Sequence, residues 1–199
     1  MTAPALLAME QIDKLKILYP PEAFWTQRGG YANSSSMHHI IRENYGTCLS
    51  RENSKRIYNS AIRHGNLYEE VALKYLAHKY STKISNVGSV QHPKYKFVRA
   101  TPDGLAILND RLTSIEIKCP VNPARVTAHI PEYLAQCHTA AQCCDTEQIL
   151  FARFLFIEQE NKYQTPKPQN PKTPEVYKVI ELRKNEFINT FINQICLQF

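Results

Sequence analysis

The stretch ATPDGLAILNDRLTSIEIKCP, residues 100–120, decides the fold. Apolar residues gather in two short runs within it, and polar turn residues separate the runs. This pattern predicts a β-hairpin with strands over 104–108 and 112–118 and with Asn109-Asp110 as the turn. Because side chains alternate between the faces of a strand, the isoleucines of the second strand should face one side and its charged residues the other.

Two carboxylates and a lysine lie on this predicted hairpin. Asp103 precedes the first strand and Glu116 comes near the end of the second, and such positions are neighbours in an antiparallel pair. Close carboxylates repel each other unless a proton or a cation lies between them, and Mg²⁺ or Mn²⁺ is the natural cation. Lys118 shares a strand face with Glu116 and could orient or help to deprotonate a water molecule. The set suits metal-assisted hydrolysis of a phosphodiester, although an isolated E-x-K strand is more often a solvated face with a weak ion pair.

The composition is that of one globular domain. The chain has 199 residues, 43% of them apolar and 21% charged, which is enough for a sizeable core. The net charge is +6 and the isoelectric point about 9.0, which suits a polyanionic partner, with nucleic acid first. Many basic proteins bind no nucleic acid, so the charge counts only where lysines and arginines gather around a site.

The cysteines and the N-terminal sequence indicate a reducing compartment. No two cysteines form a CxxC pair, and one pair is adjacent, which suits neither a routine disulfide nor a zinc knuckle. The number of cysteines allows an iron–sulfur cluster, but their spacing argues against it. The N-terminal sequence lacks the pattern of a secretory signal, and no apolar run approaches the ~20 residues of a membrane span. We expect an intracellular protein with reduced, mostly buried thiols at Cys48, Cys119, Cys137, Cys143, Cys144 and Cys196.

The remaining sequence predicts helices and strands on both sides of the hairpin. Together they indicate an α/β (α+β) fold, a central mixed β-sheet flanked by helices, in one domain. The apolar run ILFARFLFIEQ is expected to be a central strand. The expected helices are 5–18, one beginning near Ser36, one over 50–80, 131–145 and 183–199, and the further strands are 84–90, 96–100, 149–159 and 176–182.

Four motifs carry a resemblance to a known family. Thr101 to Gly104 resembles an [ST]PDG motif, and IEIKCP at 115–120 resembles the motif (L/I)EIKCP. GNLYE at 65–69 resembles a GxxxE helix, and PEYLAQ at 131–136 resembles a YxxQ helix. The chain thus resembles the PD-(D/E)XK restriction-endonuclease-like core, and more narrowly the λ-exonuclease or YqaJ-like viral recombinase family, from about residue 25 to its end.

The resemblance implies which residues carry the chemistry. Asp103, Glu116 and the backbone carbonyl of Ile117 would hold Mg²⁺ or Mn²⁺, and Glu69 would bind it directly or through water. Lys118 would position the attacking water. Of the adjacent carboxylates on the GxxxE helix, the spacing selects Glu69 and leaves Glu70 on the surface.

The resemblance also implies contacts to DNA and phosphate. Arg28 with Ser35, chosen among three consecutive serines, would hold a terminal phosphate as an arginine fork with a hydroxyl. Thr101, Arg125 and Gln136 would line the path of the substrate. A loop arginine beside serines is about as often solvent-exposed, and a glutamine on an amphipathic helix is often only polar surface.

The function implied by the resemblance is a metal-dependent deoxyribonuclease. It would digest duplex DNA from a 5′ end in viral recombination or repair, work with a single-strand annealing protein and form a homotrimer, without a membrane, in the host cytoplasm or nucleus. Two alternatives stay open: an endonuclease for DNA or RNA on the same core, and an inactive DNA-binding module. We expect one nuclease domain over 1–199, with an N-terminal helix in 1–24, the core over 25–199 and a mobile proline- and lysine-rich loop over 162–175.

Overall fold

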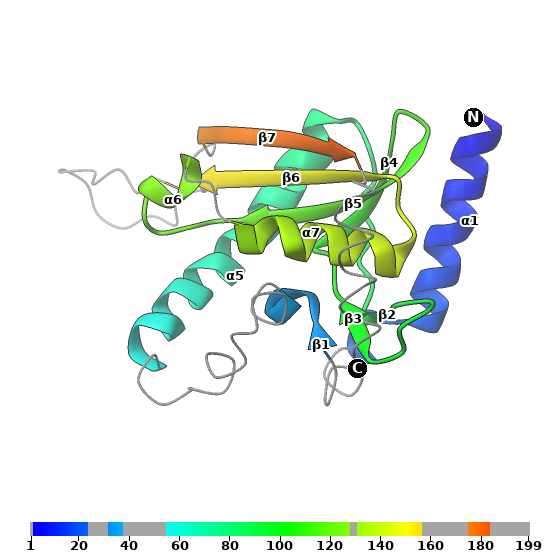
Figure 1. Ribbon diagram of the computed structural model, residues 1–199. Coiled ribbons are helices and arrows are strands. Elements are labelled where there is room, and N and C mark those ends of the chain that lie inside the picture. Colours follow the sequence, from blue (N-terminus) through cyan, green and yellow to red (C-terminus); the bar gives the residue numbers. More distant parts are fainter. Residues whose placement is uncertain (1, 24–31, 38–54, 128–130, 157–174, 184–199) are drawn as a thin grey trace.

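A computed structural model describes residues 2–23, 32–37, 55–127, 131–156 and 175–183 (Figure 1). The expected closing helix over 183–199 lies outside these ranges except for its first residue, and the expected loop over 162–175 lies outside them except for its last. Near Ser36 the described backbone forms a short 3-10 helix, η2 (Ser34–Ser36), and residues 38–54 lie outside the described part.

The centre of the molecule is a mixed four-stranded sheet. Its order is β4-β5-β6-β7, so β5 and β6 are the inner strands, as expected for the apolar run that forms β6. β5 and β6 are parallel, whereas β4–β5 and β6–β7 are antiparallel. The strands are β4 (Gly104–Leu108), β5 (Arg111–Lys118), β6 (Gln148–Leu155) and β7 (Glu175–Arg183).

The β4–β5 hairpin has the turn that its sequence predicts. Asn109 and Asp110 have φ angles of 51° and 63°, and a two-residue turn with positive φ at both positions matches the twist of the flanking strands. Leu108 pairs with Arg111 across this turn. The register that follows from it brings the start of β4 next to the end of β5.

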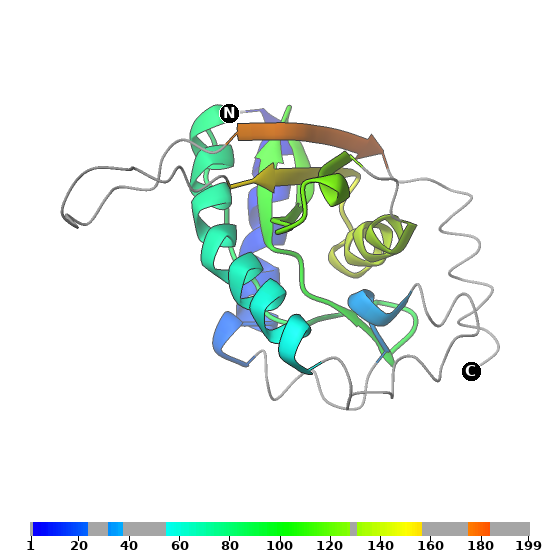
Figure 2. The same cartoon turned by 90° about the vertical axis from the view of Figure 1, so that its left-hand side faces the viewer.

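Helices cover both faces of the sheet, as Figure 2 shows for α5 (Lys55–Lys79) and α7 (Pro131–Cys144). Ala72 and Leu76 of α5 pack with Ile115 and Ile117 in one apolar cluster. On the other face, Cys137 and Ala141 of α7 pack with Ile149 and Phe151 of β6. Glu116 and Lys118 alternate with the isoleucines and therefore lie on the α7 face.

A second, smaller sheet lies beside the main one, with β3 (Val98–Ala100) between β1 (Ala32–Asn33) and β2 (Val90–Gln91). The strand expected over 84–90 is mostly absent, and only a bridge between Ser85 and Leu105 precedes β2. The reason is that Gly88 donates its N–H to the Tyr19 carbonyl at 2.7 Å. This backbone therefore pairs with the end of the first helix.

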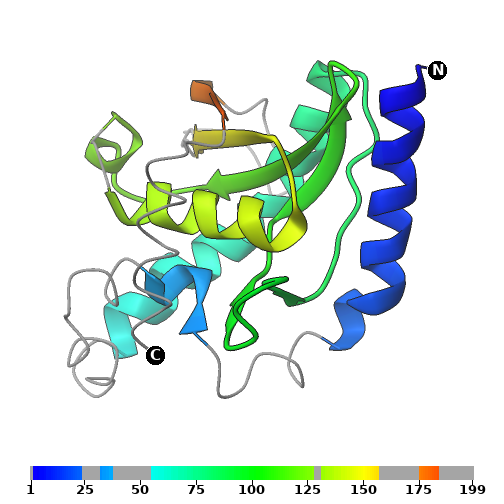
Figure 3. The same ribbon diagram turned by 45° about the vertical axis from the view of Figure 1, so that its right-hand side comes forward.

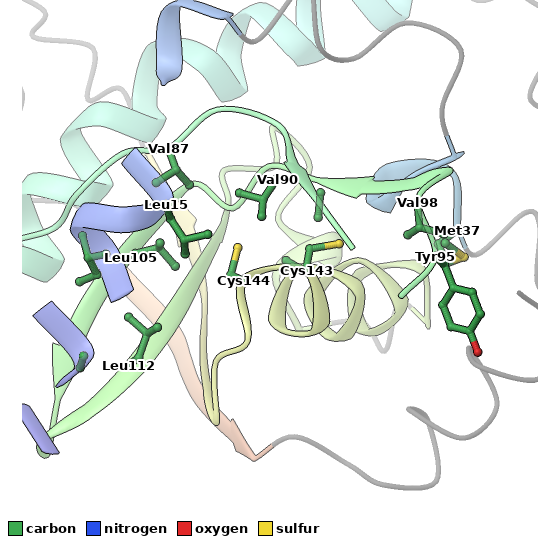
Figure 4. Packing of buried hydrophobic residues seen from close by; sticks show 14 residues of the cluster. Leu15, Met37, Val87, Val90, Tyr95, Val98, Leu105, Leu112, Cys143 and Cys144 are labelled. Carbon is green, nitrogen blue, oxygen red and sulfur yellow. The ribbon is translucent and has the colours of Figure 1, made fainter. Parts of the chain in front are cut away.

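The N-terminal helix α1 (Ala3–Leu18) lies along the β4–β5 hairpin (Figure 3). Thr2 caps it, since its hydroxyl accepts a hydrogen bond from the Ala5 N–H at 3.3 Å. Its buried face consists of Ala5, Ala8, Ile12 and Leu15, whereas Leu7 is 66% exposed. Leu15 and its neighbours form the largest cluster with β2, β3, α7 and the hairpin (Figure 4). Two short helices complete the described part: η1 (Pro21–Ala23) and α6 (Ala124–Thr127).

The cysteine prediction is confirmed where it can be followed. Four cysteines of the described ranges are free and buried: Cys119, Cys137, Cys143 and Cys144. Cys48 and Cys196 lie outside these ranges. A search of the described residues finds no helix that is long and apolar enough to cross a membrane.

Candidate active site

Asp103 lies immediately before β4 and is fixed to β5 by two hydrogen bonds. Its backbone N–H donates to the Ile115 carbonyl oxygen at 3.0 Å, and its Oδ2 accepts a hydrogen bond from the Ile117 N–H at 2.6 Å. The next residue, Gly104, has no room for a side chain, because a Cβ there would lie 2.4 Å from Cγ2 of Ile84. The hairpin thus sets the position of the Asp103 carboxylate relative to β5.

Glu116 is a buried carboxylate on β5, only 1% exposed. Nζ of Lys118 donates a hydrogen bond to its Oε1. Its Oε2 is also buried, and among the described residues it has no hydrogen-bond partner. A buried carboxylate oxygen without a partner is costly, so this oxygen favours a proton or a cation beside it.

Glu69 reaches the same region from α5. Glu69 and Asp103 line one cleft, and burial followed by repulsion from the Asp103 carboxylate raises the pKa of Glu69 to about 7. Glu70 points elsewhere, since it is exposed and lies 2.7 Å from Nζ of Lys74. The GxxxE spacing therefore selects the carboxylate that faces the cleft.

The three carboxylates and the lysine form one electrostatic unit. Burial, then repulsion from Asp103, raises the pKa of Glu116 to about 8, and burial also raises the pKa of Asp103. Burial alone would lower the pKa of Lys118, but the Glu116 and Asp103 carboxylates outweigh it and hold this pKa above its ordinary value. When all four groups are ionised their formal charge is −2, which a divalent cation would neutralise.

The donor atoms fit Mg²⁺ or Mn²⁺, because both ions prefer oxygen ligands. The Ile117 N–H faces Asp103, and the N–H and C=O of an extended residue point to the same edge, so its carbonyl oxygen lies on the Asp103 side. Within the described ranges no three Asp, Glu, His or Cys side chains are already drawn together as a metal cage. The fit therefore rests on donor chemistry, the orphaned Glu116 oxygen and the negative charge.

A cleft of about 440 Å³ opens beside the carboxylates. Its wall is mostly hydroxyl and amide groups, and three residues expected to contact DNA or phosphate lie in it: Ser35, Thr101 and Gln136. The other lining residues come from η1, the β1–η2 segment, α5 and the chain before β4, and they are Pro21, Asn33, Ser34, Asn66, Glu69, Asn86, Val87, Pro102 and Asp103.

Neither of the two expected arginines is among the described residues that line this cleft. Arg28 lies outside the described ranges. Arg125 belongs to α6, which packs against β6 and β7, and its exposed guanidinium lies 3.9 Å from the Glu132 carboxylate. Its part in DNA binding stays a prediction.

Several cleft residues escaped the sequence analysis. Asn66 had a usable signal, because it precedes Glu69 by three residues and so shares its face of α5. Ser34 is one of the three serines among which Ser35 was chosen. Asn33 and Asn86 had no signal, since Asn33 reaches the cleft through the pairing of β1 with β3 and Asn86 lies in the irregular stretch before β2. Long-range packing of this kind leaves no local pattern.

Comparison with known proteins identifies a family. The family described as "YqaJ-like viral recombinase domain" matches residues 28–147. An uncharacterized protein of Acanthamoeba polyphaga mimivirus is 26% identical over 145 residues, which are 64% of this chain and 26% of that protein. The chain thus spans about a quarter of that relative's length.

Solved structures share the fold. LHK-Exo in complex with dAMP matches with a TM-score of 0.62 and 19% identity, and the match covers 88% of each chain. The alkaline exonuclease LHK-Exo from Laribacter hongkongensis matches with a TM-score of 0.60 and 19% identity, and the match covers 89% of this chain and 91% of that one. A phage-related exonuclease from Haemophilus somnus 129PT matches with a TM-score of 0.56 and 16% identity, and the match covers 84% of this chain and 90% of that one. The expected fold class, a PD-(D/E)XK-like core with a central mixed sheet, is confirmed.

Proposed function

This chain belongs to the YqaJ-like viral recombinase family, and on that premise we propose that it is a metal-dependent deoxyribonuclease that hydrolyses phosphodiester bonds of duplex DNA. The family and the exonuclease fold support a nuclease that acts in recombination. The observation that carries the proposal is the buried Glu116, whose Oε2 has no partner among the described residues, inside a cluster that carries a charge of −2 when its three carboxylates and Lys118 are ionised.

In this proposal four groups hold the ion: Asp103, Glu116, the carbonyl oxygen of Ile117, and Glu69 directly or through water. When bound, Mg²⁺ or Mn²⁺ supplies stabilisation of the charge that develops on the phosphate and makes a nearby water more acidic. Asp103 is already oriented by the N–H of Ile117, so it needs little rearrangement to act as a ligand.

Lys118 orients the attacking water. Its pKa is held above the ordinary value by the carboxylates, so it is an ammonium group at neutral pH and donates hydrogen bonds. The ammonium group lies against Glu116 Oε1 and its side chain is 22% exposed, which leaves it access to solvent from a buried position. A donor placed beside the carboxylates can hold the water in the direction of the phosphate.

The cleft wall suits the sugar-phosphate chain of DNA. Ser35, Thr101 and Gln136 offer hydroxyl and amide groups beside Glu69 and Asp103, and such neutral groups are common partners of phosphate and sugar oxygens. We place the scissile phosphate next to Asp103 and a neighbouring phosphate near Ser35. The net charge of +6 favours the approach of DNA to this acidic site.

The nuclease is tested with linear and covalently closed duplex DNA, each with Mg²⁺ and with EDTA. We expect loss of the linear DNA only, dependent on the metal and abolished in Lys118→Ala, with Lys74→Ala on the exposed face of α5 as the matched control. Cleavage of the closed circle would replace the exonuclease by the endonuclease alternative. DNA binding without any cleavage would leave a binding module.

We propose a 5′-to-3′ direction, which rests on the phosphate contact expected at Ser35. On a duplex with one 5′-phosphorylated strand, a label at the 5′ end of that strand should be released first and a label at its 3′ end last. Ser35→Ala should raise KM for 5′-phosphorylated ends and leave ends with a 5′ hydroxyl unchanged. Equal degradation from both strand ends would contradict the direction. The homotrimer and the annealing-protein partner stay predictions.

A further inference from the structure

Arg153 is a buried charged residue in the apolar strand β6, and the proposed mechanism does not use it. It is 6% exposed and is the direct neighbour of Lys118 in the parallel register of β5 and β6. Residues paired in this way point to the same face, which here is the face covered by α7. A buried guanidinium beside the lysine of the active site requires a reason, because burying a charge is costly.

The guanidinium holds the end of α6. Its Nη1 donates hydrogen bonds to the carbonyl oxygens of Val126 at 2.9 Å and Arg125 at 3.3 Å. α6 has only four residues, so these carbonyls cannot be satisfied by a continuing helix. A cation at the C-terminal end of a helix also has a favourable electrostatic interaction there. Arg153 thereby ties the chain that leads into α7 to the sheet.

The same guanidinium lies against aromatic rings. Its Cζ is 5.5 Å from the ring centroid of Tyr133 and 5.0 Å from that of Phe151. The two rings contact each other with centroids 5.7 Å apart. Tyr133 is in the first turn of α7 and Phe151 is on β6. A cation is attracted to an aromatic ring, and more strongly when water is excluded.

Tyr133 is the link to the active site. Nζ of Lys118 lies 5.5 Å from the centroid of the Tyr133 ring, and the same nitrogen donates to Glu116. The Tyr133 ring therefore has cations of two strands as neighbours, one from Lys118 and one from Arg153. Its position limits the directions in which the long lysine side chain can turn.

We propose that Arg153 is a positioning residue for Lys118 and acts through Tyr133. By holding the α6 carbonyls and the aromatic pair, it keeps the Tyr133 ring in place as a wall that confines the Lys118 ammonium group to the Glu116 side. In this role it acts through Tyr133 and not on the phosphate or the metal. The inference rests on the proposed function only for its effect on catalysis, because the packing around Arg153 exists without it.

The catalytic test uses steady-state kinetics of linear duplex digestion in Mg²⁺. Arg153→Met should lower kcat by about 10–100-fold with KM for DNA within about 2-fold, as is typical when groups that orient a catalytic residue are lost. Arg153→Lys, which keeps a charge and donors, should recover most of the kcat. Arg111→Met, an exposed arginine on β5, is the matched control and should behave as wild type.

A double variant separates positioning from a general loss of structure. Tyr133→Leu should lower kcat by a similar factor, and the double variant Tyr133→Leu with Arg153→Met should be no slower than the worse single variant, because both act on one device. Losses that multiply, a change confined to KM, or an Arg153→Met enzyme with kcat within 2-fold of wild type would each overturn the proposal.

A readout without catalysis keeps the two proposals apart. Hydrogen exchange of α7 in EDTA should be faster in Arg153→Met than in wild type or Arg111→Met. If the wild-type chain digests no DNA, the proposed function fails. The exchange result alone then decides whether Arg153 holds Tyr133 and α7 in place. Unchanged exchange in Arg153→Met would refute this positioning role whether or not the chain is a nuclease.

Discussion

The metal-free protein should lose stability as the pH rises from about 5 to about 8, and Glu116→Gln should remove most of this loss. Burial, then the neighbouring Asp103 carboxylate, raises the pKa of Glu116 to about 8 from its ordinary 4.5. Because the folded state binds this proton more tightly than the unfolded state, its contribution to stability is full below about pH 4.5. The contribution is then lost as the pH rises through the folded pKa.

The size of the effect follows from the two pKa values. Each unit between them corresponds to about 1.4 kcal/mol, so the interval from 4.5 to about 8 sets a ceiling of about 5 kcal/mol. With a urea m-value of about 2–3 kcal/mol/M for a chain of this size, the midpoint should move by up to about 2 M. Glu69 acts in the same direction, but it is only half-buried, so we assign it a smaller share.

The assay is urea denaturation followed by circular dichroism at pH 5 and pH 8, in EDTA. Lys118, the partner of Glu116, is protonated at both pH values, so it adds no titration of its own to the comparison. Glu70→Gln is the matched control, because Glu70 is exposed and lies outside the cluster. If Glu116→Gln keeps the pH dependence of wild type, the electrostatic reasoning is wrong.

Three further predictions concern packing and are checked by the same denaturation assay. Gly65→Ala should stabilise the protein by about 0.5–1 kcal/mol, since the glycine lies inside α5 and a Cβ there meets nothing within 4 Å; a loss of stability would show that this position is crowded. Gly88→Ala should destabilise it by about 1–3 kcal/mol, because the new Cβ would lie 2.5 Å from the Pro20 carbonyl oxygen; an unchanged midpoint would contradict this contact. Phe154→Ala should cost about 3–5 kcal/mol, since the ring is 0% exposed and packs edge-on against Tyr75; a cost below 1 kcal/mol would mean that the core closes over the space.

The hairpin could be predicted because its signals are local. Asn109-Asp110 requires positive φ at two adjacent residues, and alternation along β5 decides which side chains share a face. The meeting of Asp103 with Glu116 follows from those two facts and the register. Residues 100–120 therefore contain the carboxylate pair, the lysine and the hairpin that brings them together.

Features that depend on distant packing could not be predicted. α1 has apolar residues all around, so nothing local chose Ala5 and Ala8 over Leu7 for the buried face. The stretch 84–90 reads as a strand, but the end of α1 takes its backbone hydrogen bond at Gly88. Arg153 had a signal that was passed over, since it is the one basic residue in the apolar run of β6.

The central claim is that the carboxylate cluster exists to hold a divalent cation. Electron paramagnetic resonance of Mn²⁺ titrated into the protein at pH 8 tests it most directly, because free and bound Mn²⁺ give different signals. We predict Mn²⁺ binding that Mg²⁺ displaces, that is lost in Glu116→Gln and that is kept in Glu70→Gln. Equal Mn²⁺ binding by Glu116→Gln and wild type, or none by wild type, would contradict the account.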